Sequence, residues 1–197
     1  MISLLRTASW MLATFTILTG VLYPAFVTLV AQSAFPRQAN GSRLETPGGI
    51  VGSELLGQQY THSKYFWGRP SATGPTPYNG MGGSGSNQAP TNPGLESAIR
   101  ERADRIRSAD PDNRAPIPID LVTASASGLD PHISPAGALY QVGRVAKARG
   151  WDEERLRALV VDHVEPPTFG FLGQSRVHVL RLNLAVDASA DRTGNRL

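Results

Sequence analysis

The sequence predicts one N-terminal transmembrane helix followed by a soluble α+β domain with long Gly/Pro-rich loops. Its first 36 residues include a long run without charge, and later segments switch between helical and strand-like hydrophobic patterns. It also contains 20 glycines and 15 prolines among 197 residues, which requires long stretches of loop. With 41% hydrophobic and 18% charged residues, the chain can bury a core and is not a charge-rich disordered segment.

The N-terminal helix is predicted from an uncharged segment between Arg6 and Arg37. Its apolar centre, residues 10–31, would form a helix about 33 Å long, which matches a bilayer core of ~30 Å. We therefore assign residues 1–36 to the N-terminus and membrane helix and residues 37–197 to a soluble domain. A cleavable signal peptide is the alternative, although its apolar region is usually roughly 7–15 residues long. Arginines flank both ends, so the positive-inside rule does not fix the orientation.

Short strands and a long loop follow the helix. Residues 38–61 contain turn sequences at Asn40-Gly41 and Pro47-Gly48-Gly49, which favour tight turns between strands. In residues 68–94, 12 of 27 positions are glycine or proline. A loop of this length is either disordered or functional.

Three helices and two further strands are predicted downstream. Asn92-Pro93 begins a helix to Ser108, Ser134-Pro135 begins one that Gly150 ends, and Asp152 caps a third. The apolar residues 119–123 suit a buried strand. Leu180, Leu182, Leu184 and Val186 alternate, which predicts a last strand that also carries His178.

Composition and motifs exclude several functions. The net charge of +3 is too small for a basic nucleic-acid-binding stripe, and the absence of cysteine excludes disulfides and thiolate sites. There is no GxxxxGK[ST] phosphate loop. Gly80, Gly82 and Gly85 have dinucleotide-loop spacing without the required strand and helix. The four histidines lack zinc-ligand spacing. We predict no catalytic residue, no metal site and no tightly bound cofactor.

One cluster allows an enzymatic alternative. Ser125, Ser127, Asp130 and His132 lie close enough in the sequence to suggest a hydrolytic site. No GxSxG motif accompanies them, and serine and aspartate more often bind their own backbone in turns. A membrane-anchored extracytoplasmic hydrolase that uses Ser125 or Ser127 with His132 is therefore the second hypothesis.

Several segments, taken together, resemble the KdpC family, the C subunits of bacterial Kdp potassium-transporting P-type ATPases. They are Leu55-Leu56-Gly57-Gln58, Tyr65-Phe66-Trp67-Gly68-Arg69-Pro70-Ser71-Ala72, Gly85-Ser86-Asn87 with Thr91-Asn92-Pro93, residues 122–134, Tyr140-Gln141-Val142, Arg144-Val145-Ala146, Gly170-Phe171-Leu172-Gly173 and Leu182-Asn183-Leu184-Ala185. They cover nearly the whole chain in order. The sequence departs from the family pattern at Gln88, Ala89 and Gly143, and His178 and Arg181 replace an asparagine and a glutamate.

The resemblance implies an accessory, non-hydrolysing subunit of a high-affinity, ATP-driven potassium uptake complex. Such a subunit assembles or stabilises the complex with a channel-like potassium-binding subunit and a P-type ATP-hydrolysing subunit. The family has also been described as a catalytic chaperone that raises the ATP affinity of the latter, so ATP would be bound only in the complex. The resemblance further implies a single-pass protein of the bacterial inner membrane, in contact with lipid, with a cytoplasmic N-terminus and an extracytoplasmic soluble domain.

The resemblance also supplies the candidate site residues. We expect residues 68–94 and 122–134 to form the partner-contact surface. The residues that carry the family motif or contact partners are Gln58, Arg69, Pro70, Gly85, Ser86, Asn87, Asn92, Ser125, Ser127, Gly128, Asp130, His132, Gln141, Arg144 and Asn183.

Overall fold

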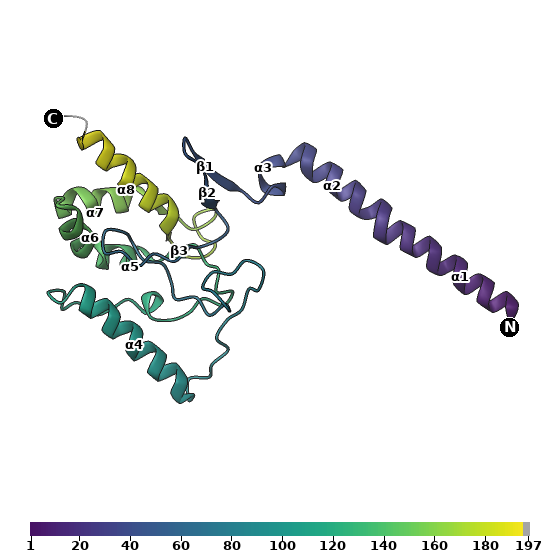
Figure 1. Cartoon of the computed structure of the whole chain (residues 1–197), viewed down its shortest axis with the longest axis horizontal. Helices are drawn as coiled ribbons and strands as arrows, with labels where there is room; N and C mark the ends of the chain where they lie inside the picture. Colours follow the sequence, from purple (N-terminus) through teal and green to yellow (C-terminus); the bar gives the residue numbers. More distant parts are fainter. Residues whose placement is uncertain (195–197) are drawn as a thin grey trace. The chain divides into compact units, whose positions relative to one another are not determined.

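The computed structural model describes residues 1–194, with side chains described as far as residue 190. The chain forms two compact units, Met1–Ser53 (unit 1) and Glu54–Leu197 (unit 2). Their elements are labelled in Figure 1.

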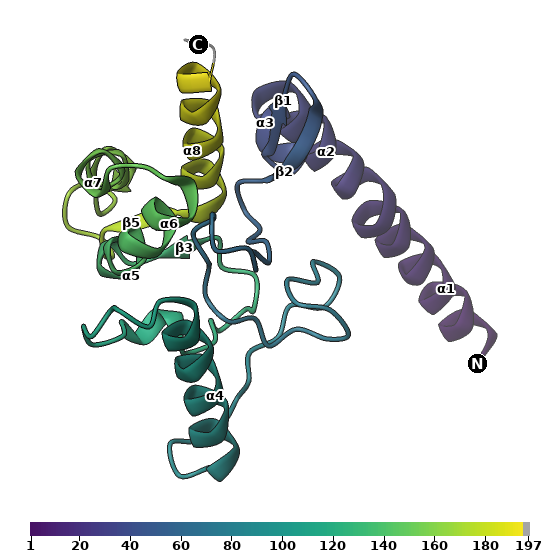
Figure 2. The same cartoon turned by 60° about the vertical axis from the view of Figure 1, so that its left-hand side comes forward.

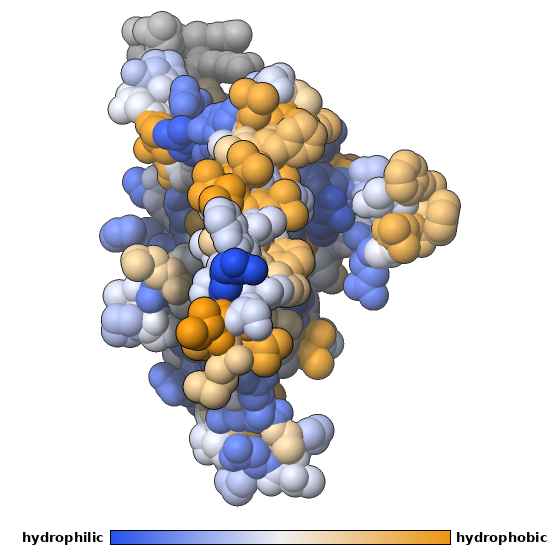
Figure 3. Space-filling model, turned by 90° about the vertical axis from the view of Figure 1, so that its right-hand side faces the viewer, coloured by the Kyte–Doolittle hydropathy of each residue, from blue (hydrophilic) through white to orange (hydrophobic). Residues whose placement is uncertain are grey.

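Unit 1 begins with one continuous helix, Ile2–Ala34, of 33 residues. It consists of α1 (Ile2–Ile17), the π-helical turn η1 (Leu18–Leu22) and α2 (Tyr23–Ala34). The helix is long and apolar enough to cross a membrane, and none of its apolar window is buried inside the chain. Figure 3 shows apolar side chains on this exposed surface. This is the long N-terminal apolar helix that the sequence predicted.

Pro24 accounts for the π-helical turn within this helix. Proline has no N–H, and its ring clashes with the carbonyl four residues earlier, here that of Gly20. The N–H of Tyr23 bonds instead to the carbonyl of Leu18, five residues earlier. The helix therefore continues through the proline with one widened turn.

A hairpin completes unit 1 after the short helix α3 (Pro36–Ala39). Strands β1 (Arg43–Thr46) and β2 (Gly49–Ser53) pair antiparallel on either side of Pro47-Gly48. Gly49 has a φ of 114°, a conformation that favours glycine. The predicted strands and turn are confirmed.

Within residues 54–194, unit 2 combines six helical segments with one small sheet. Its helices are α4 (Pro93–Ala109), the 3-10 turn η2 (Ile119–Leu121), α5 (Pro135–Tyr140), α6 (Val142–Arg149), α7 (Glu153–Asp162) and α8 (Val179–Gly194). Strands β3 (His132–Ile133), β5 (Arg176–His178) and β4 (Val164–Glu165) pair antiparallel in that order. In both Figure 1 and Figure 2, α4 lies below the other helices of unit 2. This is the predicted α+β fold.

The core of unit 2 is a single apolar cluster. Its members come from nearly every element: Phe66, Ile106, Leu121, Val122, Ile133, Ala138, Val142, Val145, Ala146, Leu156, Val160, Val177, Val179, Leu182 and Val186. Phe66 is fully buried although it lies in a segment without regular structure. The core therefore also fixes the irregular chain that leads into the long loop.

The predicted helix starts are confirmed by their capping bonds. Asn92 Oδ1 accepts from Gly94 N at 2.8 Å, Ser134 Oγ from Gly137 N at 2.9 Å, and Asp152 Oδ2 from Arg155 N at 3.1 Å. Gly150 ends α6 in the left-handed conformation, as predicted.

The predicted last strand was wrong, because residues 179–194 form α8. Leucines at alternate positions suggested a strand, but the buried residues Val179, Leu182 and Val186 are spaced three and four apart. His178 ends β5 and shares no strand face with Leu180 or Leu182.

Two other predictions were also wrong. Residues 119–123 contain a 3-10 turn rather than a strand, since Leu121 and Val122 are buried consecutively while Ile119 is exposed. The helix expected between Ser134 and Gly150 is two helices that meet at Gln141. The side chain of Gln141 accepts from Trp67 N at this junction.

Candidate functional site

The two loops of the predicted contact surface lie against each other in unit 2. Ser84 N donates to Ser127 O at 2.8 Å, and Ser71 Oγ donates to Gly128 O at 2.7 Å. Upstream of these loops, Gly57 N donates to Leu129 O at 2.8 Å. Hydrogen bonds to backbone carbonyls thus join segments that are distant in the sequence.

Glycines permit this close approach. A Cβ at Gly85 would lie 2.6 Å from the carbonyl oxygen of Ala126. At Gly128, with φ of 68°, a Cβ would lie 2.6 Å from the oxygen of Ser84 and 2.7 Å from Cγ2 of Thr73. All three distances are shorter than side chains tolerate, so the predicted motif glycines Gly85 and Gly128 are required for packing.

Short polar bonds hold the long loop in place. Ser71 Oγ accepts from Tyr78 N at 2.9 Å, and the hydroxyl of Thr73 donates to Thr76 O at 2.8 Å. The hydroxyl of Tyr78 donates to Arg69 O. Burial, with a smaller contribution from the negative charge of Asp130, raises the pKa of Tyr78 to about 12. Tyr78 therefore stays protonated and acts as a donor inside the loop.

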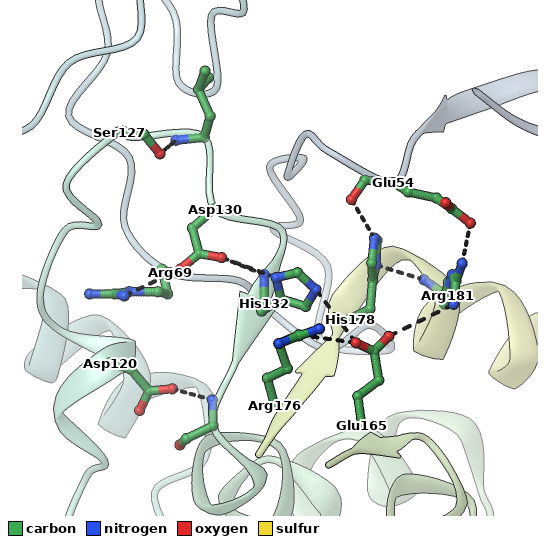
Figure 4. Close-up of polar contacts among 12 residues, drawn as sticks. Glu54, Arg69, Asp120, Ser127, Asp130, His132, Glu165, Arg176, His178 and Arg181 are labelled. Carbon is green, nitrogen blue, oxygen red and sulfur yellow. Dashed lines mark hydrogen bonds and ion pairs between the residues drawn. The ribbon is translucent and has the colours of Figure 1, made fainter. Parts of the chain in front are cut away.

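The serine and histidine cluster forms turns and does not assemble as a hydrolytic site. Ser127 Oγ accepts from Leu129 N at 3.2 Å, and Asp130 Oδ1 accepts from His132 N at 3.0 Å. Ser125 is buried. Among the described residues, no hydrogen bond joins either serine to His132, and Figure 4 shows Ser127 apart from the imidazole. The geometry gives no support to the hydrolase hypothesis.

His132 instead lies in a chain of charged side chains (Figure 4). Arg69 Nη1 is 3.3 Å from Asp130 Oδ2, and His132 Nδ1 is 3.4 Å from Asp130 Oδ1. His132 Nε2 is 4.0 Å from Glu165 Oε2, and Arg176 Nε donates to the same oxygen at 3.0 Å. This row of side chains extends from the loops to the sheet, because β3 carries His132, β4 carries Glu165 and β5 carries Arg176.

The second part of this polar cluster surrounds His178. The imidazole Nε2 is 3.0 Å from Glu54 O, and Nδ1 is 3.4 Å from Arg181 N. Arg181 also binds the carboxylate of Glu54, and its Nη1 is 3.7 Å from Glu165 Oε1. The His132 and His178 rings meet edge to face with centroids 5.1 Å apart. His178 is thus a buried, hydrogen-bonded histidine.

Burial and neighbouring charges shift two pKa values in this cluster. Burial raises the pKa of Asp130, but hydrogen bonds from His132 and the charge of Arg69 outweigh it, so the net shift is downward. Burial is the largest effect on His178 and lowers its pKa, and the charges of His132 and Arg181 lower it further. The hydrogen bond to Glu54 O and the charge of Glu165 raise the pKa, but the net shift is downward. Asp130 is therefore ionised and His178 neutral at pH 7.

We expect unit 2 to lose stability between pH 7.5 and 5.5 because of His178. Its pKa is lower in the folded state than the ordinary value of about 6.5, so protons bind the unfolded chain first as pH falls. Below pH ~6.5 the unfolded chain binds a proton at His178 that the folded chain does not bind. The free energy of unfolding therefore falls by up to about 1.4 kcal/mol between pH 7.5 and 5.5. Urea unfolding of the full chain in detergent at both pH values measures it.

His178→Asn should reduce this pH dependence, and His62→Asn, which removes an exposed histidine of the same unit, is the matched control. An equal pH dependence in the His178→Asn variant and the unmodified chain would contradict the assignment.

Three of the residues expected to carry the family motif or to contact partners are buried and bind the backbone of residues 63–67. Asn183 Oδ1 accepts from Phe66 N at 2.8 Å, and its Nδ2 donates to Phe66 O at 3.0 Å. Gln141 Oε1 accepts from Trp67 N at 2.8 Å, and its Nε2 donates to Trp67 O at 3.1 Å.

Arg144 completes this group, which we call the polar clamp (Gln141, Arg144 and Asn183). Its guanidinium donates to Ser63 O at 2.6 Å, Tyr65 O at 3.1 Å and Gln141 Oε1 at 2.6 Å, and stacks 4.1 Å from the Trp67 ring centroid. All three clamp side chains are at most 5% exposed. Their role in this chain is to hold residues 63–67 in place.

The remaining predicted site residues lie along the long loop and its flanks. Gln58 accepts from the Tyr60 hydroxyl at 3.2 Å, Pro70 is half-buried, and Ser86 and Asn87 are exposed. Asn92 caps α4. Sequence reasoning missed Glu54, Glu165 and Arg176, whose charged partners are distant in the chain, and no local motif marks them.

The chain matches known proteins over nearly its whole length. The family described as "KdpC: K+-transporting ATPase, c chain" matches residues 5–188. A relative from Methylococcus capsulatus named "Potassium-transporting ATPase KdpC subunit" is 55% identical over 188 residues, 95% of this chain and 99% of its own. Relatives of the same name from Herpetosiphon aurantiacus and Sorangium cellulosum are 58% and 54% identical over 173 and 189 residues. These alignments cover 88% and 96% of this chain, and 90% and 100% of theirs.

Proposed function

Because the chain belongs to the KdpC family of K+-transporting ATPase subunits, we propose that it is a non-hydrolysing accessory subunit of such a complex. In this role it assembles or stabilises the complex by binding a potassium-binding, channel-like subunit and a P-type ATP-hydrolysing subunit. The observation that supports this most is the joining of two family-like loops, residues 68–94 and 122–134, into one polar surface on unit 2.

The surface is suited to binding a protein rather than to catalysis. Ser86 and Asn87 are exposed on it, while Ser127 and Asp130 are engaged in local turns. Loops held by glycine packing present polar groups in a fixed arrangement, which lowers the entropy lost on binding. We propose that any effect on ATP affinity passes through the complex as a coupling between sites, and that ATP is bound only in the assembled complex.

This contact role predicts that Asn87→Gly and His132→Gln weaken assembly by about fivefold each, the effect of losing roughly 1 kcal/mol at an interface. Asn87 has a φ of 49°, so glycine removes its side chain without backbone strain. The measurement is co-purification of the other ATPase subunits with a tagged full chain from membranes, together with potassium-stimulated ATP hydrolysis.

His62→Gln is the matched control, because His62 is exposed elsewhere in unit 2. If both variants lose thermal stability while their folded fraction assembles normally, the loops are structural only. If the unmodified chain brings down no ATPase subunit, the proposed function itself is wrong.

We further propose that the chain is anchored in the bacterial inner membrane with unit 2 outside the cytoplasm, as the resemblance implies. The chain has no cysteine, so a single introduced thiol reports its own location. Met81→Cys, at a side chain that is 99% exposed, should react with an impermeant maleimide in intact cells. Ser3→Cys, near the other end of the apolar helix, should react only after permeabilisation. The reverse pattern would place unit 2 in the cytoplasm.

A further inference from the structure

The connection between β4 and β5 exposes an apolar tip. Residues 166–175 contain no charged residue. Phe169 is 84% exposed, Phe171 80% and Leu172 58%, and none of the three belongs to the core cluster. In Figure 2 this loop forms the left-hand edge of unit 2. We call residues 166–175 the apolar loop.

Backbone hydrogen bonds fix the shape of the tip. Thr168 N donates to Leu172 O and Leu172 N to Thr168 O, both at 2.9 Å, and Gly170 N donates to Pro167 O at 2.9 Å. The two rings are therefore displayed on a closed turn. Fixed aromatic groups lose little conformational freedom when they enter a pocket.

Phe169 occupies a backbone conformation that does not suit it. Its φ is 55°, in the left-handed region that glycine and asparagine adopt far more readily than bulky residues. Its ring is almost wholly in solvent, so packing within unit 2 gains little from it. Glycine or asparagine would serve the turn better, which indicates that the ring serves an outside contact.

The surroundings of the tip match a protein interface better than a lipid surface. The base of the apolar loop carries the ion pair of Glu165 with Arg176, at 3.0 Å, so an apolar centre is bordered by charge. Protein interfaces have this arrangement, with aromatic anchors in the centre. Segments that settle in a lipid interface combine their apolar residues with a Lys/Arg-rich face and with Trp or Tyr anchors, and residues 166–175 contain no Lys, Arg, Trp or Tyr.

We propose that the apolar loop inserts Phe169 and Phe171 into an uncharged apolar pocket of another subunit of the potassium-transporting ATPase. This inference rests on the proposed function and adds a second contact, separate from the polar surface of residues 68–94 and 122–134. The receiving pocket must lack charge, because desolvating a charged group against the rings would have no compensation.

The test places a photoreactive phenylalanine analogue, p-benzoylphenylalanine, at position 171 of the full chain in membranes that contain the ATPase. We expect irradiation to produce a covalent adduct with another ATPase subunit, identified by mass. The same analogue at His62, which is exposed in unit 2 and lies outside residues 68–94 and 122–134, reports the background of non-specific adducts. An adduct with lipid or with a second copy of this chain, or no adduct above background, overturns the proposal.

A paired variant separates contact from folding. Phe169→Asn with Phe171→Ser should leave thermal stability unchanged or higher, since asparagine suits the left-handed position. The same variant should lower co-purification of the other subunits by tenfold or more, as loss of a central aromatic pair does. Val161→Ser, at a side chain 57% exposed on α7, is the control. Full assembly of the paired variant, while the unmodified chain assembles, contradicts this proposal alone.

Discussion

Replacing Arg144 by leucine should lower the free energy of unfolding of the chain by about 3–5 kcal/mol, because it leaves three acceptors without their donor, at about 1–3 kcal/mol each. Arg144 is 5% exposed, and burial lowers the pKa of its guanidinium to about 10. No carboxylate oxygen lies within 4.0 Å of it among the described residues. Carbonyl oxygens of Ser63 and Tyr65, with Gln141 Oε1, solvate the charge, and Arg144→Leu leaves all three without this donor.

Urea unfolding of the full chain in detergent, followed by tryptophan fluorescence, measures the effect. Arg100→Leu is the matched control, since the Arg100 side chain is 75% exposed and its ion pair with Glu96 is a surface one. Arg144→Lys should recover only part of the loss, because an ammonium group lacks the planar fork that reaches several acceptors. Equal stability of the Arg144→Leu and Arg100→Leu variants would show that the clamp contributes little.

A methyl group at position 128 should separate the two loops. Gly128→Ala places a side chain in the left-handed region and forces its Cβ against the Ser84 carbonyl and Thr73. The strain and the overlap together should cost about 2–5 kcal/mol. We expect lower stability in urea, faster proteolysis within residues 68–94, and loss of co-purified ATPase subunits.

Gly82→Ala, in the same loop, is the control for this change. The nearest atom to a Cβ at Gly82 is Asn79 Nδ2 at 3.8 Å, an ordinary contact distance. If Gly128→Ala were as stable and as well assembled as Gly82→Ala, the close backbone approach would not be what positions the surface.

Local chemistry made some elements predictable from the sequence. The caps Asn92, Ser134 and Asp152 and the terminating Gly150 act on bonds within a few residues, so their identity alone located helix ends. The apolar helix at the N-terminus was equally clear, since length and lack of charge suffice for it.

Tertiary context decided the elements that were predicted wrongly. Leu180, Leu182 and Val186 fit a strand by alternation, but helix α8 also buries them while it directs Asn183 at Phe66. That bond joins residues 117 apart, which no window along the sequence reveals.

The candidate site likewise contains residues that the sequence indicated and residues that only the tertiary structure brings in. Arg69, Asp130 and His132 were expected from the family-like segments, and the structure joins them in one network. Glu165 and Arg176 enter that network through strand pairing of β4 with β5, and so were invisible beforehand. The clamp residues Gln141, Arg144 and Asn183 had been expected to carry the family motif or to contact partners. Their burial was not predictable, because polar side chains are usually exposed.

The polar clamp also has a consequence for the time course of biosynthesis. Phe66 leaves the ribosome long before Asn183, which provides the partner for both of its backbone polar groups. At about 5–20 residues per second, the 117 intervening residues take about 6–23 s. Throughout that interval Phe66 has no native core to enter. The nascent chain therefore passes through a long period in which residues 63–67 depend on solvent or a chaperone, and a chain that stops before residue 183 cannot close its core.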